Sequence, residues 1–361
     1  MRLAAATLAR TTNPVDNHER MSPGRLALLA GGSLGIAFAA TRGLRARESY
    51  SLDGRAVLIT GGSRGLGLLL AREAAAEGAR VAICGRDPNS LERARLALSR
   101  IGAEVVAVPC DVADRDSVRR LVRAVQQRLG PLDVLINNAG VIEVGPAEAM
   151  SVSDYEEAMA TNFWGMLYPT LEVLPDMRAR GSGRIVNITS IGGKLGIPHL
   201  LPYSASKFAA VGFSQGLRAE VARDGIKVVS VVPGLMRTGS PRNAIFRGRH
   251  RAEYAWFSIG DSLPGLSVSA EEAARRIVAA CKRGDAEVLF PLTARLASVM
   301  NAVAPNLTAG ILGVAGRLLP EGHRSSGRKP GRASQSRISP SWLTRLGDRA
   351  ARKYNQIAPA E

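Results

Sequence analysis

From residue 55 onward, short apolar runs alternate with longer helical stretches, and this alternation limits the possible folds more than any other feature. The runs are residues 56–59, 81–84, 105–108, 134–136, 185–188 and 228–232. Each is nearly continuous in apolar residues, as a parallel strand covered on both faces requires. The spacings leave room for one crossover helix between neighbouring strands. The sequence therefore predicts a single α/β domain over residues 51–291, built on a doubly wound parallel sheet.

A further set of elements is predicted after residue 268. Ser269 with Glu272 three residues later has the pattern of a capping box, and it predicts a helix through Cys281. Residues 288–290 follow as a seventh strand. Apolar residues then recur at helical spacing on both sides of Pro305, which predicts two amphipathic helices within residues 292–320. They could pack on the core, form an apolar lid, contact a second subunit or rest on a membrane.

The net charge of +17 comes largely from the two ends of the chain. Residues 1–50 carry seven Arg against three acidic residues, and residues 321–361 carry nine Lys or Arg against three. These basic stretches lack interleaved aromatic residues that stack on bases, so no nucleic-acid partner is expected. We expect residues 321–361 to be a basic, mostly disordered tail in which residues 340–343 begin one short helix.

Three scattered cysteines, Cys84, Cys110 and Cys281, argue against a disulfide framework or a structural zinc site. No metal is expected.

The N-terminal part of the chain carries the clue to location. Residues 1–25 are mixed and polar, and we expect them to be disordered, with Met21 as an alternative start. Residues 26–41 form an uncharged run, and the apolar segment extends to residue 47 with its flanking arginines. A run of 16 residues is marginal for a spanning helix, so a membrane anchor, a signal-peptide core and a loosely packed helix all remain open. The expected location is cytoplasmic, with membrane association through residues 26–41 as the open question.

A glycine-rich loop, TGGSRGLG at residues 60–67, follows the first strand and opens the first helix. Glycines at these positions permit a tight turn and let the backbone approach a pyrophosphate at the helix N-terminus. The strand before the loop and the helix after it are the context that this motif needs. The residues of the predicted phosphate-binding loop are Gly61, Ser63, Arg64, Gly65, Leu66 and Gly67.

The end of the second strand bears on the choice between the two nicotinamide cofactors. An acidic residue there would accept hydrogen bonds from a free adenosine 2′-hydroxyl. This chain has Gly85 followed by Arg86, and Arg64 lies in the loop opposite. Two guanidinium groups suit a 2′-phosphate, so NADP(H) is favoured and NAD(H) remains the alternative.

Tyr203 and Lys207 are four residues apart, so on one helix they share a face. A cation beside the phenol would lower its pKa, and a phenol so tuned can protonate a carbonyl oxygen as a hydride arrives. Ser190, at the end of the fifth strand, would donate a hydrogen bond to the same oxygen. These residues predict an alcohol dehydrogenase or carbonyl reductase.

Four motifs occur in a fixed order within residues 53–290: TGGSRGLG, NNAG at 137–140, a Ser thirteen residues before a Tyr, and YSASK at 203–207. On these motifs the chain resembles the short-chain dehydrogenase/reductase family. The resemblance implies a Rossmann-like fold and a homodimer or homotetramer. It also implies that Lys207 holds the nicotinamide ribose and that Asn162 positions a water that relays the proton.

The same resemblance implies further contacts with the cofactor. They are Asp111 and Val112 at the adenine, Asn138, Ala139 and Gly140 at the adenosine ribose, Pro233 and Gly234 beside the nicotinamide, and Thr238 near the carboxamide or the phosphates.

Residues 237–251, in the segment expected to close over the substrate, hold five Arg and no acid, with aromatic residues just after them. Two substrate classes follow. A lipophilic ketone or alcohol taken from a membrane would explain the apolar N-terminal run and the amphipathic helices. A 3-oxoacyl group on an acidic carrier protein would explain the Arg-rich loop. A non-catalytic NADP-binding scaffold is disfavoured because Ser190, Tyr203 and Lys207 are all present.

Overall fold

The computed structural model describes residues 50–321 and 327–357. Its centre is a parallel sheet with the strand order β11-β7-β6-β4-β1-β2-β3. The strands are β1 (Ala56–Ile59), β2 (Arg80–Gly85), β3 (Val105–Pro109), β4 (Val134–Asn137), β6 (Gly183–Ile188), β7 (Ile226–Pro233) and β11 (Glu287–Phe290). Each predicted apolar run forms a strand, so the prediction of a doubly wound α/β sheet is confirmed.

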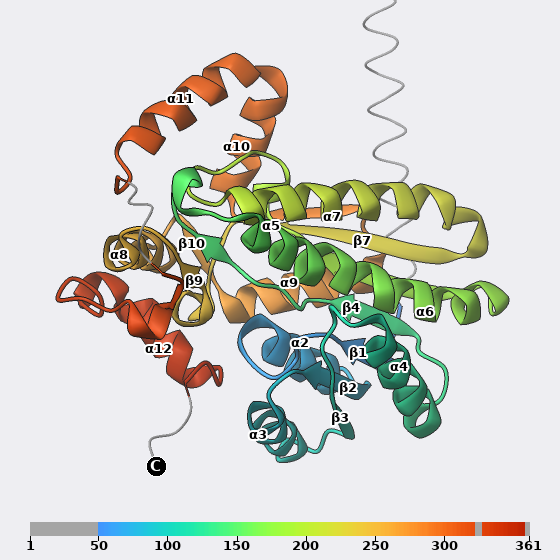
Figure 1. The fold of residues 1–361 in the computed structure, drawn as a ribbon. Coiled ribbons are helices and arrows are strands. Elements are labelled where there is room, and N and C mark those ends of the chain that lie inside the picture. The colour runs from blue at the N-terminus through green and yellow to red at the C-terminus, as the bar shows by residue number, and fades with distance from the viewer. Residues whose placement is uncertain (1–49, 322–326, 358–361) are drawn as a thin grey trace, which may run out of the picture. The chain divides into compact units, whose positions relative to one another are not determined.

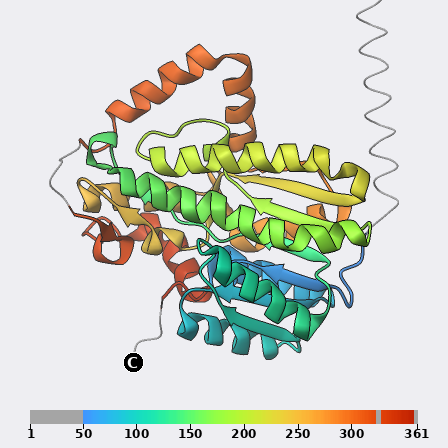
Figure 2. The same ribbon diagram turned by 45° about the vertical axis from the view of Figure 1, so that its right-hand side comes forward.

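Helices cover both faces of the sheet (Figures 1 and 2). One face carries α2 (Gly65–Ala76), α3 (Pro88–Ser99) and α9 (Ala270–Arg283), and the other carries α4 (Arg115–Leu129), α6 (Gly165–Ala179) and α7 (Leu201–Glu220). Successive side chains of β1 join opposite cores: Val57 packs on the first face and Leu58 on the second. Because both faces are buried, the strands are mostly apolar, and the buried polar side chains of Asn137 and Asn187 are hydrogen-bonded to each other.

Further elements follow the carboxyl ends of the strands. They are β5 (Glu143–Val144), η1 (Ala147–Ala149), α5 (Val152–Met159), the π-helix η2 (Ala160–Trp164), η3 (Ile191–Gly193), β8 (Leu235–Arg237), η5 (Ser240–Asn243), β9 (Ile245–Phe246), α8 (His250–Ser262) and β10 (Ser267–Ser269). The short η4 (Ala222–Asp224) instead leads from α7 into the start of β7. As predicted, Ser269 caps α9, and its Oγ accepts a hydrogen bond from the Glu272 amide at 3.2 Å.

The prediction of a mostly disordered C-terminal tail is wrong for its described residues, 327–357. They form β12 (Lys329–Pro330), η6 (Gly331–Ala333), η7 (Trp342–Thr344) and α12 (Arg345–Lys353). Ala350 and Tyr354 join the core beside α2 and α9, Asp348 pairs with Arg242 at 3.0 Å, and β12 pairs with β9. Composition alone suggested disorder because many contacts of this stretch are polar pairs with residues far away in the sequence.

The two predicted amphipathic helices are α10 (Leu292–Val303) and α11 (Pro305–Arg317), which project as a hairpin (Figures 1 and 2). Their apolar stripe faces outward, which rules out packing on the core as its role. Its exposed members are Leu292, Leu296, Val299, Val303, Leu307, Ile311, Val314 and Leu318.

Among the helices of residues 50–321 and 327–357, none is long and apolar enough to cross a membrane. The predictions for residues 1–25 and for the segment 26–47 concern residues outside those described.

Candidate active site

A cavity of about 380 Å³ lies at the carboxyl ends of β1, β2 and β4. This is the edge where parallel α/β sheets bind ligands. Most of the site residues expected from the sequence meet there. They are Gly61, Ser63, Arg64, Gly65, Leu66, Gly67, Arg86, Asp111, Val112, Asn138, Ala139, Gly140, Asn162, Tyr203, Lys207 and Thr238.

Three expected residues are not among those that line the cavity: Ser190, Pro233 and Gly234. Pro233 ends β7 in register with Phe290. A Cβ on Gly234 would lie 3.0 Å from that of Ala294, so this glycine permits the close approach of α10. Since Pro233 and Gly234 do not line the cavity, their expected contacts with a nicotinamide stay a prediction. Ser190 is connected to the site by its side-chain hydrogen bond with Tyr203.

The glycine-rich loop is packed tightly against the NNAG segment. The Asn138 Nδ2 donates to the Thr60 carbonyl at 2.9 Å, and a Cβ on Gly61 would lie 2.9 Å from the Cα of Ala139. A Cβ on Gly67 would collide with the Gly61 carbonyl. This packing places the N-terminus of α2 at the cavity, which Gly65, Leu66 and Gly67 of its first turn line. The cradle therefore fits a dinucleotide, whose pyrophosphate needs such an approach.

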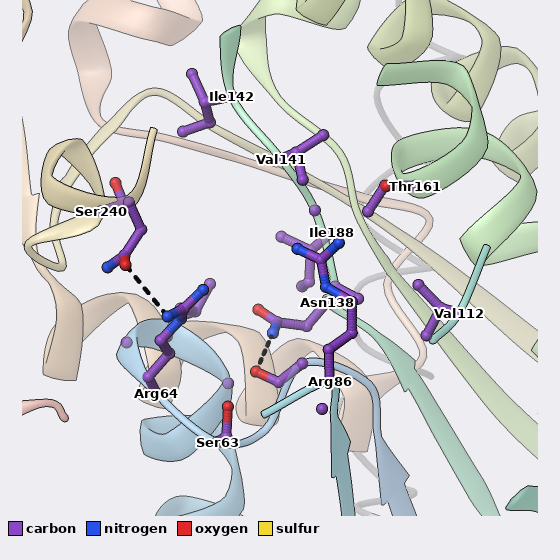
Figure 3. A pocket seen from close by; sticks show the side chains of 18 of the residues that line it. Ser63, Arg64, Arg86, Val112, Asn138, Val141, Ile142, Thr161, Ile188 and Ser240 are labelled. Carbon is purple, nitrogen blue, oxygen red and sulfur yellow. Dashed lines mark hydrogen bonds between the residues drawn. The ribbon is translucent and has the colours of Figure 1, made fainter. Parts of the chain in front are cut away.

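Two guanidinium groups stand at the same end of the cavity. Figure 3 shows Arg64 extending from the glycine-rich loop and Arg86 from the end of β2. Burial lowers the pKa of Arg64, and the charge of Arg86 lowers it further. The nearby Asp87 is engaged in capping α3, where its carboxylate accepts from the amides of Asn89 and Ser90, both at 3.2 Å. The pair of arginines thus forms a positive site suited to a phosphate.

Helix α7 presents Tyr203 and Lys207 to the cavity. Lys207 is 4% exposed, its Nζ donates to the Ile188 carbonyl at 3.0 Å, and the same Nζ lies 5.7 Å from the centre of the Tyr203 ring. Burial lowers the pKa of Lys207 to about 8. Burial also raises the pKa of Tyr203, and a side-chain hydrogen bond with Ser190 lowers it in part. In this structure burial therefore moves the pKa of Tyr203 opposite to the expected direction, and Lys207 is not among the causes of the shift.

Asn162 lies in the π-helix η2 and is 1% exposed. Its amide bonds both main-chain groups of Val141, at 2.9 Å and 3.1 Å, and donates to Ser206 Oγ at 3.0 Å. A π-helical turn is a local departure that often occurs at functional sites. Here it lets one side chain join the segment after NNAG to the helix that carries Tyr203.

Tyr203 packs against apolar side chains. Tyr203, Ile197 and Trp256 pack beside a buried cluster built from Val144, Leu200, Ala244, Phe246, Tyr254 and Phe257. In Figure 3, Ile142 and Ser63 lie at opposite ends of the cavity.

Sequence reasoning missed several residues that line the cavity. They include Cys84, Asp87, Ser90, Cys110, Val141, Ile142, Thr161, Ile188, Met236, Ser240, Asn243, Ala244 and Gln356. Val141 and Ile142 directly follow NNAG, so their position carried a usable signal. Gln356 carried none, because it reaches the site only through the folded C-terminal segment.

Comparison with known proteins identifies the family. The family model described as short chain dehydrogenase matches residues 55–245. A dehydrogenase/reductase SDR family protein 7-like of Anopheles gambiae is 35% identical over 72% of this chain and 83% of its own length. A fatty acyl-CoA reductase of Acinetobacter baylyi is 32% identical over 79% of this chain and 92% of its own.

Among solved structures, a variant of the actinorhodin polyketide ketoreductase, crystallised with NADPH, is 34% identical with a TM-score of 0.59. The match covers 65% of this chain and 95% of that protein. Together with the Rossmann-like sheet, these matches show that the chain belongs to the short-chain dehydrogenase/reductase family of oxidoreductases.

Proposed function

We propose that this oxidoreductase uses NADP(H) to interconvert a carbonyl and an alcohol on a lipophilic substrate. The observation that carries the proposal is that Tyr203, Lys207 and the glycine-rich loop line one cavity. A nicotinamide cofactor, when bound, supplies or accepts the hydride. The loop glycines and the first turn of α2 would hold its pyrophosphate, and Arg64 and Arg86 would hold the 2′-phosphate.

Tyr203 is the proposed acid–base group. Its raised pKa keeps the phenol protonated at neutral pH, which suits donation of a proton to a carbonyl oxygen. The Ser190 hydroxyl, hydrogen-bonded to Tyr203, would donate to the same oxygen as negative charge develops there. The buried Lys207 cation would stabilise the phenolate that remains.

Asn162 is proposed to act on the reaction through position. Its hydrogen bonds to Val141 and Ser206 hold α7 against the segment after NNAG. The relay water that the family resemblance implies stays a prediction, as do the dimer or tetramer and the cytoplasmic location.

Two surfaces support a lipophilic substrate presented at a membrane. The first is the apolar cluster beside Tyr203. The second is the hairpin of α10 and α11, whose exposed apolar stripe lies in a stretch, residues 288–320, that holds Arg295 and Arg317 but no acidic residue. Such a face suits the interface of an anionic bilayer. The hairpin contacts the segment that follows Ser190, where the Asn301 Nδ2 donates to the Lys194 carbonyl at 3.0 Å.

A 3-oxoacyl reductase acting on a carrier protein is the alternative, favoured by the likeness to a polyketide ketoreductase. The Arg-rich loop gives it less support than its composition suggested. Arg237 donates to Ser267 Oγ at 2.9 Å, Arg242 pairs with Asp348 at 3.0 Å, and Arg247 pairs with Asp154 at 2.7 Å. These three guanidinium groups are committed inside the protein, which leaves fewer to bind an acidic carrier.

Oxidation of NADPH by the purified full-length protein tests the proposal. Long-chain aldehydes and ketones are compared with 3-oxoacyl thioesters, and Tyr203→Phe is the control. The Tyr203→Phe variant should lose about 10²- to 10⁴-fold in turnover, the usual contribution of general acid catalysis, while it retains cofactor affinity. Undiminished turnover in the Tyr203→Phe variant refutes the mechanism. If the unmodified protein turns over only the 3-oxoacyl thioesters, the lipophilic substrate is wrong and the 3-oxoacyl reductase is supported.

A further inference from the structure

The last described residues of the chain reach the glycine-rich loop. After α12, the Tyr354 carbonyl accepts a hydrogen bond from the Gly65 amide at 2.8 Å. The Tyr354 side chain is 3% exposed and joins the core cluster that includes α2 and α9. We call residues 354–357 the C-terminal strap. It is anchored at the N-terminus of α2, where a cofactor pyrophosphate is expected.

Asn355 ties the strap to two neighbouring segments. Its Nδ2 donates to the Ser63 carbonyl at 2.8 Å and to the Ser90 carbonyl at 3.0 Å, and its Oδ1 accepts from Arg93 Nε at 3.0 Å. Its φ is 58°, a left-handed conformation that Asn adopts more readily than most residues. The strap is therefore held to both the loop and α3.

Gln356 turns into the cofactor cavity. Its Nε2 donates to the Thr238 carbonyl at 3.3 Å, and its Oε1 accepts from Asn243 Nδ2 at 2.6 Å. Asn243 Oδ1 in turn accepts from Arg64 at 3.2 Å. A Cβ on Gly65 would lie 2.5 Å from Gln356 Nε2, so this amide rests directly on the loop.

Residues of the strap line two different cavities. Gln356 lines the cofactor cavity, whereas Asn355 and Ile357 line a second hollow of about 710 Å³ on the other side. Tyr354 anchors the strap in the core, whereas Asn355 and Gln356 are held mainly by side-chain hydrogen bonds, and segments with few buried apolar contacts open at low free-energy cost. Residues 355–357 can therefore be displaced without unfolding the domain.

We propose that the C-terminal strap closes the diphosphate end of the cavity, that Gln356 donates a hydrogen bond to a cofactor phosphate, and that cofactor exchange requires release of the strap. The inference rests on the proposed function in one respect, namely that a dinucleotide binds here. An amide Nε2 carries two hydrogens, and the Thr238 carbonyl takes one of them. Leu66 and Gly67, in the first turn of α2, also line the cavity, so the strap leaves part of the anion-binding turn to the phosphates.

The test is the rate at which NADPH leaves the full-length protein, measured by stopped-flow displacement, together with its Kd. Gln356→Ala should raise both by about tenfold, because a hydrogen bond to a charged group is lost. Asn355→Gly preserves the left-handed backbone but removes the anchor, so it should also speed release. Gln127→Ala, an equivalent change on exposed α4, should alter neither.

A second readout distinguishes binding from stability. Amide hydrogen exchange in residues 345–357 should slow when NADPH is added, whereas the Tm of the cofactor-free Gln356→Ala variant should match that of the unmodified protein. Three outcomes overturn the inference and leave the proposed function intact. They are an unchanged rate of NADPH release in both strap variants, a lower Kd for NADPH in either variant, and amide exchange in residues 345–357 that does not change when NADPH is added. Failure of the unmodified protein to bind NADPH or NADH overturns both.

Discussion

The pair Arg64 and Arg86 predicts how the protein distinguishes its cofactors. Arg86 is exposed at the end of β2, whereas Arg64 is partly buried and donates to Asn243 at 3.2 Å. Burial lowers the pKa of Arg64 most, and the positive charge of Arg86 lowers it further while no anion is bound. A 2′-phosphate would relieve that repulsion, and a 2′-hydroxyl would not. Replacing either arginine with alanine should therefore weaken NADPH binding selectively.

The magnitude follows from the exposure of each side chain. A hydrogen bond to a charged group contributes about 1.5–3 kcal/mol, which corresponds to about 10- to 150-fold in Kd. Arg86→Ala should fall at the lower end, because water and salt screen an exposed charge. Arg64→Ala should fall at the upper end. The affinity for NADH should change by less than about threefold in both variants, since no charged contact is lost.

Fluorescence titration of both cofactors measures the effect, at low salt and again at high salt. Arg123→Ala on exposed α4 is the matched control for net charge. The deficit caused by Arg86→Ala should shrink at high salt. Equal affinity of the unmodified protein for NADH and NADPH, or equal weakening of both by Arg86→Ala, refutes the assignment of this pair to the 2′-phosphate.

Three further changes test other parts of the structure. Burial raises the pKa of Glu143 to about 8, so the folded state retains a proton that the unfolded state loses near pH 4.5, and stability should fall as the pH rises between these values. The unfolding free energy should fall by at most about 5 kcal/mol over this pH range. Denaturant titrations at pH 5 and pH 9 should show this fall for the unmodified protein and not for Glu143→Gln. The same pH dependence in both proteins would contradict the prediction. Leu296→Glu with Leu307→Glu on the hairpin should abolish flotation with anionic liposomes at unchanged Tm, whereas Leu171→Glu on α6 should not; equal flotation of all variants argues against the membrane surface. Ser269→Ala should cost about 1 kcal/mol of unfolding free energy through the lost cap of α9, and an unchanged denaturation midpoint would show that the cap contributes nothing.

Local pattern predicted the sheet, the glycine-rich loop and the place of Tyr203 and Lys207. A strand buried on both faces is mostly apolar, so residues 56–59 and their counterparts were recognisable without any tertiary contact. The spacing of Tyr203 and Lys207 on one helix was equally local. Their pKa values were not, because desolvation depends on what surrounds the side chains, and it raises the pKa of Tyr203 where the neighbouring cation alone suggested the opposite.

The charged segments show the same limit. The composition of the Arg-rich run 237–251 suggested a basic loop with free guanidinium groups. In the structure Arg247 pairs with Asp154 and Arg242 pairs with Asp348, and both acidic partners are far away in the sequence. No local pattern pairs residues that are about 100 positions apart.

The sequence by itself determined the fold class and the positions of the glycine-rich loop, Tyr203 and Lys207, because each follows from periodicity or spacing within a few residues. The tertiary structure alone decided two other features. It turned the apolar stripe of α10 and α11 outward, and it brought residues 354–357 to a loop near residue 65. Both depend on which distant surfaces meet, and a polar tail held by Ala350 and Tyr354 buries too little apolar area for composition to reveal its contacts.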